Sequence, residues 1–165
     1  MLKEQKGITL IALVITIIVL LILAGITIAM IGSQDSAPNK AAEAKVINEV
    51  GAAKDEIVIK AAEAVEQWYE DKYVTTGATP AVSAGAAVAG RLIDSTNGMK
   101  YSSTTTVQWA TAPVVPTGTN AASADVTFSI KSKDNGLGDN STKHYTISGK
   151  IKANGSIEWQ TGSWQ

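Results

Sequence analysis

The side chains best suited to chemistry are four oxygen donors in one short segment: Asp134, Asn135, Asp139 and Asn140. Carboxylate and amide oxygens grouped around glycines are the ligands that calcium prefers. The segment lacks the bidentate glutamate that completes an EF-hand loop, and Asp, Asn and Gly are also the usual residues of turns. A calcium site at these four residues and a plain turn between two strands therefore both remain open.

Few other residues point to catalysis. The chain contains one histidine, His144, and no cysteine. His144 falls at a polar position of a predicted strand, which favours a solvated side chain over a general base. No glycine-rich phosphate-binding loop follows a predicted strand. We therefore expect a protein that is not an enzyme and that needs no cofactor, with calcium as the one candidate ligand.

Length and charge narrow the class of protein. The chain has 165 residues and a formal net charge of −1. A nearly neutral chain without a basic patch is not expected to bind nucleic acid. Roughly 130 residues remain once an apolar N-terminal segment is set aside, and that length fits one compact domain.

The candidate calcium ligands lie between two strands of a predicted antiparallel sheet. Apolar and polar residues alternate over much of residues 99–165, for example at Val126, Phe128 and Ile130. A period of two is typical of strands that bury one face. The prolines between Ala112 and Ala124 predict a surface loop within this region.

The last predicted hairpin has a definite register. A three-residue loop ending at Gly155 pairs Ile151 with Ile157 and keeps the apolar side chains on one face. The same register places Gly149 opposite Trp159. A two-residue turn would mix the two faces. We therefore predict the three-residue loop, with Trp159 covering the bare backbone of Gly149 and packing against the preceding helix.

That long helix is predicted over residues 40–73. Apolar residues recur there at steps of three and four, which is the spacing of one helix face. They are Val46, Val50, Ala53, Ile57, Ala61, Ala64 and Trp68. Residues 74–98 are predicted to form a loop with a short helix from Ala81 to Ile93, started by Thr79 and Pro80. The apolar face of the long helix needs a sheet to pack on, which predicts an α+β fold.

The segment from Ile8 to Gly32 carries no charged side chain. As a helix it would be about 37 Å long, enough to cross a bilayer core of about 30 Å with some tilt. Lysines precede it and Asp35 follows it, which favours a cytoplasmic N-terminus. Asp35 and Ser36 are suitable N-caps and Pro38 suits a first helical turn, so we expect a kink or a new helix there.

The leader and the apolar segment together resemble those of type IV prepilins. The residues that carry the resemblance are Lys6-Gly7-Ile8-Thr9-Leu10-Ile11, which are similar to class III leaders of pilins and pseudopilins of Gram-positive bacteria. The resemblance implies that a prepilin peptidase removes residues 1–7 by cutting between Gly7 and Ile8, and then N-methylates Ile8. It further implies a transmembrane and filament-core helix over residues 8–32 and a pilin globular domain over residues 33–165.

The function implied by the resemblance is that of a structural subunit of a type IV pilus or related extracellular filament. The precursor would wait in the cytoplasmic membrane and then polymerise at the cell surface through its apolar helix. Its partners would be copies of itself, the membrane, prepilin peptidase, an assembly ATPase and a platform membrane protein. Cell adhesion, motility, secretion and DNA uptake all remain open as roles. The alternatives are a pseudopilin of a type II secretion or DNA-uptake system, and a single-span surface protein that does not polymerise.

One position departs from the family pattern. Pilins usually carry glutamate as the fifth residue of the mature chain, where it is thought to pair with the methylated amine of a neighbouring subunit. Here that residue is Ala12. We therefore expect contacts between the apolar helices to depend on small residues and on the hydroxyls of Thr9 and Thr16. We also expect assembly to tolerate the loss of N-methylation.

Overall fold

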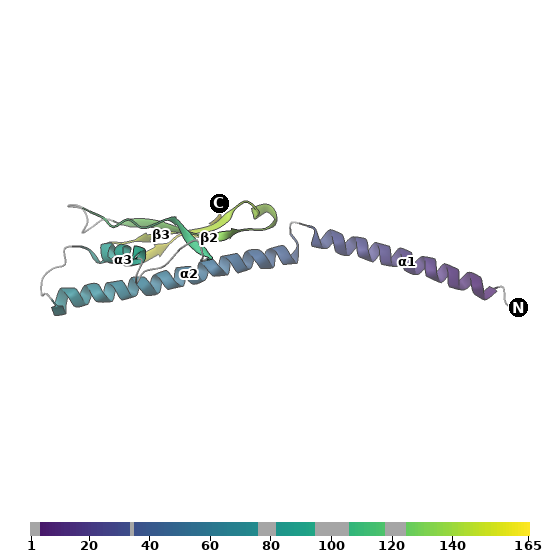
Figure 1. Cartoon of the computed structure of the whole chain (residues 1–165), viewed down its shortest axis with the longest axis horizontal. Coiled ribbons are helices and arrows are strands. Elements are labelled where there is room, and N and C mark those ends of the chain that lie inside the picture. Colours follow the sequence, from purple (N-terminus) through teal and green to yellow (C-terminus); the bar gives the residue numbers. More distant parts are fainter. Residues whose placement is uncertain (1–3, 34, 76–81, 95–105, 118–124) are drawn as a thin grey trace. The chain divides into compact units, whose positions relative to one another are not determined.

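The computed structural model of the chain is shown in Figure 1. It describes residues 4–33, 35–75, 82–94, 106–117 and 125–165. The chain divides into two compact units, Met1–Ala41 and Ala42–Gln165.

The first unit contains the apolar helix α1, Glu4–Ile31. Its stretch Leu10–Ile31 is long and apolar enough to cross a membrane, and the most apolar part of that stretch is not buried by the chain itself. Leu13, Leu20 and Leu21 are each at least 60% exposed. A helix of this length and composition is a candidate membrane span. The sequence prediction of a helix able to cross a membrane is thereby confirmed.

A second helix, α2, begins at Ala37 and ends at Glu70. Ser36 stands directly before it, and the Ser36 carbonyl oxygen accepts a hydrogen bond from the Lys40 N–H at 3.1 Å. The Ser36 hydroxyl is buried and has no hydrogen-bond partner among the described residues, so the predicted side-chain cap at Ser36 is wrong. Asp35 pairs with the Lys40 ammonium at 2.9 Å instead of capping the helix.

The second unit is built on an antiparallel sheet. Its described strands are β1 Val107–Thr111, β2 Val126–Asn135, β3 His144–Ile151, β4 Ile157–Trp159 and β5 Ser163–Trp164. The strands are ordered β1-β2-β3-β4, and β5 pairs with β3 beside β4. Helix α3, Ala84–Ile93, is the remaining α-helix of the described chain. Helices combined with an antiparallel sheet make the fold α+β, as predicted.

The core lies between α2, α3 and one face of the sheet. The α2 residues of the core are Val50, Ala53, Ile57, Ala61 and Ala64. The strands contribute the alternating side chains of Val126, Phe128, Ile130, Ile147 and Ile151, and α3 contributes Val88, Ala89 and Leu92. The helical and strand periods read from the sequence therefore identify most of the core. Trp68 is half-buried at its border, where its Nε1 donates to the Val82 carbonyl at 2.9 Å.

Two local predictions are corrected. Helix α3 begins at Ala84 instead of Ala81, because the Ser83 hydroxyl caps it by accepting from the Ala86 N–H at 3.1 Å; Thr79 and Pro80 lie outside the described residues. The predicted surface loop from Ala112 is not all at the surface, since Pro113 is fully buried and Val115 packs against the core. At the end of α2, a π-helical turn over Asp71–Thr75 follows the last α-helical residue.

The predicted register of the β3–β4 hairpin is confirmed. Ile151 pairs with Ile157 and Gly149 with Trp159, and Gly155 has a φ of +87°. Trp159 was predicted to cover Gly149, but the side chain nearest to this glycine is that of Phe128. A Cβ on Gly149 would lie 2.5–3.1 Å from three atoms of the Phe128 ring. Phe128 covers this glycine because it is the cross-strand partner of Gly149 on β2.

Gly85 marks a close approach between α3 and the β3–β4 hairpin. Its N–H donates to the Ala153 carbonyl at 3.0 Å. A Cβ at this position would overlap the carbonyl oxygen of Lys152 and lie 3.1 Å from the Cα of Ala153. The neighbours are backbone atoms, which cannot rotate away as a side chain can. Only glycine therefore fits here without moving the hairpin.

We expect Gly85→Ala to destabilise the protein by about 1–3 kcal/mol, because overpacked sites strain the surrounding backbone. Gly90→Ala in the same helix is the matched control, since its Cβ would meet only the Val115 Cγ2 at 3.7 Å. That control should be neutral or stabilising by up to about 1 kcal/mol. Thermal unfolding, monitored by circular dichroism, measures the melting temperatures of the two variants. Equal melting temperatures for the two variants would contradict the close approach at Gly85.

Candidate functional site

The predicted cleavage site lies near the start of α1. The helix begins at Glu4, so the peptide bond between Gly7 and Ile8 belongs to its first turns. Glycine is a poor helix former, which makes this turn easier to open than an alanine or leucine turn would be.

The four candidate calcium ligands lie in the connection from β2 to β3. Asp134 and Asn135 end β2, while Asp139 and Asn140 belong to a short 3₁₀ turn, Gly138–Asn140. The Asn135 Nδ2 donates to the Ser141 carbonyl at 3.0 Å. Both aspartates are exposed. Among the described residues no group of three or more His, Cys, Asp or Glu side chains is arranged to hold a metal. Calcium binding by these residues stays a prediction.

Asn140 has a structural role in this connection. Its Nδ2 donates to the Glu43 Oε1 at 3.0 Å, which ties the β2–β3 connection to the first part of α2 in the second unit. The nearby His144 is half-buried, with its Nδ1 shielded and without a hydrogen-bond partner among the described residues. His144 is therefore less solvated than its strand position predicted.

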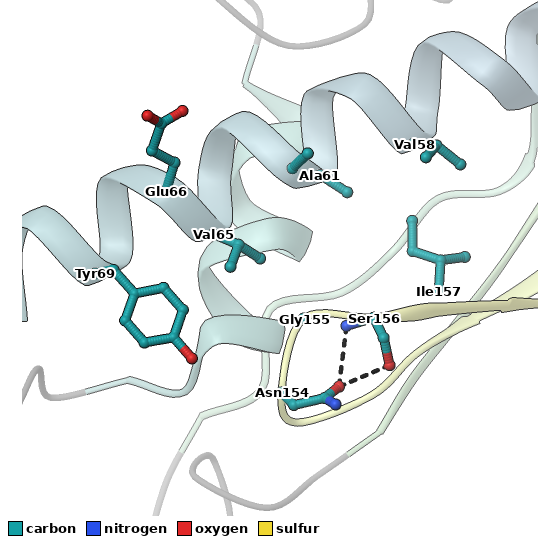
Figure 2. A pocket seen from close by; sticks show the side chains of 10 residues that line it. Val58, Ala61, Val65, Glu66, Tyr69, Asn154, Gly155, Ser156 and Ile157 are labelled. Carbon is teal, nitrogen blue, oxygen red and sulfur yellow. Dashed lines mark hydrogen bonds between the residues drawn. The ribbon is translucent and has the colours of Figure 1, made fainter.

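A groove between α2 and the β3–β4 hairpin is a surface feature that the sequence did not predict (Figure 2). Its volume is about 510 Å³. The side of the groove on α2 is lined by Val58, Ala61, Ala62, Val65, Glu66 and Tyr69, and the hairpin side by Asn154, Gly155, Ser156 and Ile157. We call it the α2–hairpin groove. Cavities of this size are typical of binding sites for a small ligand or for side chains of a partner.

The hairpin side of the groove is held by local hydrogen bonds. The Asn154 Oδ1 accepts from the Ser156 N–H at 3.0 Å and from the Ser156 hydroxyl at 2.7 Å, as Figure 2 shows. The Gly155 N–H donates to the Lys152 carbonyl at 2.8 Å. A Cβ on Gly155 would overlap the Val65 side chain and lie 3.5 Å from the Ala84 Cβ. Glycine therefore permits both the positive φ and the close contact with α2.

The α2 side of the groove is mostly apolar. Val58 and Tyr69 are 46% and 49% exposed, although they lie on the flank of a helix whose other face is core. Glu66 is the one charged residue among the ten that line the groove, and Figure 2 shows it extending from α2 away from the hairpin. Tyr69 stacks on Tyr73 with ring centroids 6.0 Å apart, which continues the exposed surface toward the end of α2.

This surface suits binding better than catalysis. Its lining offers one carboxylate and no nucleophile paired with a base, and catalytic sites need such pairs within hydrogen-bond distance. The sequence did contain a signal for it. Val58, Val65 and Tyr69 make the apolar stripe of α2 wider than the core requires. The position of the hairpin beside that stripe depends on contacts between residues far apart in the chain.

Asp125 and Lys150 have clearly shifted pKa values, and neither residue lines the α2–hairpin groove. The Lys150 Nζ lies 2.8 Å from the Asp125 Oδ2. The hydrogen bond from Lys150 lowers the pKa of Asp125, and the same bond raises the pKa of Lys150. The free energy of folding that this pair contributes through Asp125 is present at pH values above the ordinary pKa of an aspartate. It is lost as the pH falls through the lowered pKa of Asp125. The pair is exposed, so its contribution to folding is small.

Comparison with known proteins adds no relative: no family model matches the chain, and neither a curated protein nor a solved structure matches it.

Proposed function

We propose that the chain is the precursor of a structural subunit of a type IV pilus or a related extracellular filament. The observation that carries the proposal is the apolar helix α1 directly behind the Lys6-Gly7 leader motif. Its apolar side chains from Leu10 to Ile31 lie on every side of the helix and are exposed. A pilin uses such a helix twice, first as a membrane anchor and then as part of a filament core. Lipid and neighbouring apolar helices are similar surroundings for it.

The second unit supports the proposal by its independence from α1. Its core is closed by α2, α3 and the sheet, and all the residues of that core belong to Ala42–Gln165. Such a unit can remain in water while α1 moves between lipid and filament. A long helix on a small antiparallel sheet is also the pilin-like arrangement that the resemblance implies.

Partners and processing follow from the same proposal. Prepilin peptidase would cut between Gly7 and Ile8 and methylate the amine of Ile8. An assembly ATPase and a platform membrane protein would drive extraction, because transfer of α1 between two apolar surroundings supplies little energy by itself. Copies of the chain would form the filament outside the cell.

Electron microscopy of material sheared from the cell surface tests the proposal. Filaments that bind an antibody against the Ala42–Gln165 unit are expected. Full retention of the chain in the membrane, with no labelled filament, would favour the single-span surface protein instead. Short filaments that appear only when the chain is overproduced would favour a pseudopilin of a secretion or DNA-uptake system.

The structure limits the role that was expected of the Thr16 hydroxyl in α1, while the Thr9 side chain lies outside the described part of the chain. The Thr16 Oγ1 donates to the Leu13 carbonyl of its own helix at 2.8 Å, and the Thr27 Oγ1 donates to the Leu23 carbonyl at 2.7 Å. Each hydroxyl has one proton to donate, so Thr16 can only accept a hydrogen bond from a neighbouring helix while this bond persists. Side-chain packing then becomes the main contact between copies of α1.

We expect filament number to be unchanged when N-methylation is lost. The reason is Ala12, which offers no carboxylate for the methylated amine to meet. The measurement counts filaments in cells whose prepilin peptidase cuts but does not methylate. Ala12→Glu in the same cells is the informative partner variant, because it restores the usual carboxylate. A loss of filaments from the Ala12 chain without methylation would show that the amine has another anionic partner.

A further inference from the structure

The α2–hairpin groove is left open by the described part of the chain. Figure 2 shows Val58, Val65 and Tyr69 lying toward the hairpin, whereas Glu66, which also lines the groove, extends from α2 away from the hairpin. Glu66 forms no ion pair within the described residues. A partner that fills the groove should therefore supply an apolar side chain, together with a positive charge placed to reach across to the rim.

Symmetry restricts where that partner surface can come from. A patch that binds the same patch on a second copy closes a twofold dimer. A contact between two different patches repeats without closing and can generate a helical filament. If the chain forms a filament, as proposed above, a neighbouring copy that fills the groove must do so with a different surface.

The connection between β2 and β3 offers such a surface. Leu137 is 41% exposed between Gly136 and Gly138. Lys143 is exposed at the other end of the same connection and makes no ion pair among the described residues. An apolar tip with a neighbouring lysine matches the two properties that the groove and its rim require.

This connection is also rigid enough to serve as an anchor. The Gly136 N–H donates to the Lys143 carbonyl at 2.9 Å, and the Asn140 N–H donates to the Leu137 carbonyl at 3.1 Å. The side-chain bond from Asn140 to Glu43 fixes it to α2. A surface that is ordered before binding loses little conformational entropy when it docks.

The two surfaces are well separated on one copy. Asn140 contacts α2 at Glu43, whereas the groove lies beside Val58 to Tyr69. Ala62 lies 19 positions after Glu43 on α2, which is about 28 Å along the helix at 1.5 Å per residue. One copy therefore cannot fill its own groove with its own Leu137.

We infer that Leu137 of one copy docks in the α2–hairpin groove of the next copy, with Lys143 beside Glu66. The inference rests on the proposed filament function and names the contact between globular units within it. In a filament whose α2 helices run parallel, this contact offsets the two copies by about 28 Å along the helix.

Disulfide trapping tests the contact in the full chain, which contains no cysteine of its own. Leu137→Cys combined with Val58→Cys should form a ladder of linked chains after mild oxidation, in sheared filaments and in the membrane fraction. Leu137→Cys combined with Ile59→Cys is the matched control, because Ile59 is similarly exposed but does not line the groove. The control pair should link at least tenfold less.

Charge reversal supplies a second measurement on the same contact. Glu66→Lys should reduce linkage of the Leu137–Val58 cysteine pair several-fold by placing two cations together, and Lys143→Glu should do so by placing two anions together. The double reversal should restore linkage, because it re-forms the opposite charges. If the yield of linked chains is the same in all three variants, Lys143 and Glu66 are not part of the contact.

The outcomes separate this inference from the filament function. Normal filaments with no ladder, or with equal ladders for the test and control pairs, would overturn the docking contact and leave the filament intact. A specific ladder without any filament would support the contact and reject the filament function. Absence of both ladder and filament would reject the two together.

Discussion

Gly7→Val will leave the chain as a full-length precursor in the membrane and will abolish surface filaments. The branched valine side chain crowds the backbone at the bond to be cut, next to Ile8. The measurement is an immunoblot that separates the precursor from a product shorter by residues 1–7. This is the largest effect that we predict, because processing comes before every later step of the proposed function.

The control for this variant is the same substitution farther along α1. A Cβ on Gly25 would meet nothing within 4 Å, so Gly25→Val adds a similar side chain to the same helix without touching the leader. We expect Gly25→Val to be processed normally. Processing of Gly7→Val at the normal rate would contradict the assignment of the cleavage site.

Phe128→Ala will destabilise the second unit by about 3–5 kcal/mol, the usual range for a buried phenylalanine. Phe128 is 2% exposed and covers the bare backbone of Gly149. Its ring also makes edge contacts with Trp109 and Trp159, at centroid distances of 5.7 Å and 5.3 Å. Truncation therefore removes the central ring of a three-ring cluster and leaves a cavity beside a glycine.

The measurement is the midpoint of thermal or urea unfolding of the Ala42–Gln165 unit. A loss of this size should lower the melting temperature by roughly 10 °C or more. Trp159→Ala is expected to have a smaller effect, since Trp159 is only half-buried. Leu137→Ala serves as the surface control. A Phe128→Ala unit as stable as the control would contradict the described core.

The periodicity of the sequence predicted that Trp159 pairs with Gly149, but it did not predict that Phe128 lies nearest to this glycine. The β3–β4 register was predictable because the strands alternate with period two and Gly155 identifies the turn. The partner of Gly149 on β2 was not, because the β2–β3 register shifts between Lys131 and Asn135. A shift of this kind leaves no periodic signal in the sequence. Strand β5 was also missed, since two residues are too few to alternate.

For helix α2, too, one part of the structure was predictable from the sequence and another part was not. The core face of α2 follows the 3.6-residue period and was predictable from the spacing of Val50, Ile57 and Ala64. The groove on its flank was not, because it also requires the hairpin at Asn154 to lie against Val65. The β2–β3 connection was predictable as a turn, but its tie to Glu43 joins side chains 97 residues apart. Residues separated this far in the chain are related only by the fold.

The most direct test of the account is the N-terminal residue of the chain in filaments sheared from the cell surface. Mass spectrometry of the N-terminal peptide should show a chain that begins at Ile8 with a methylated amino group. Filaments whose subunits retain Met1 and the leader would contradict the proposal that this chain is a processed pilin-like subunit.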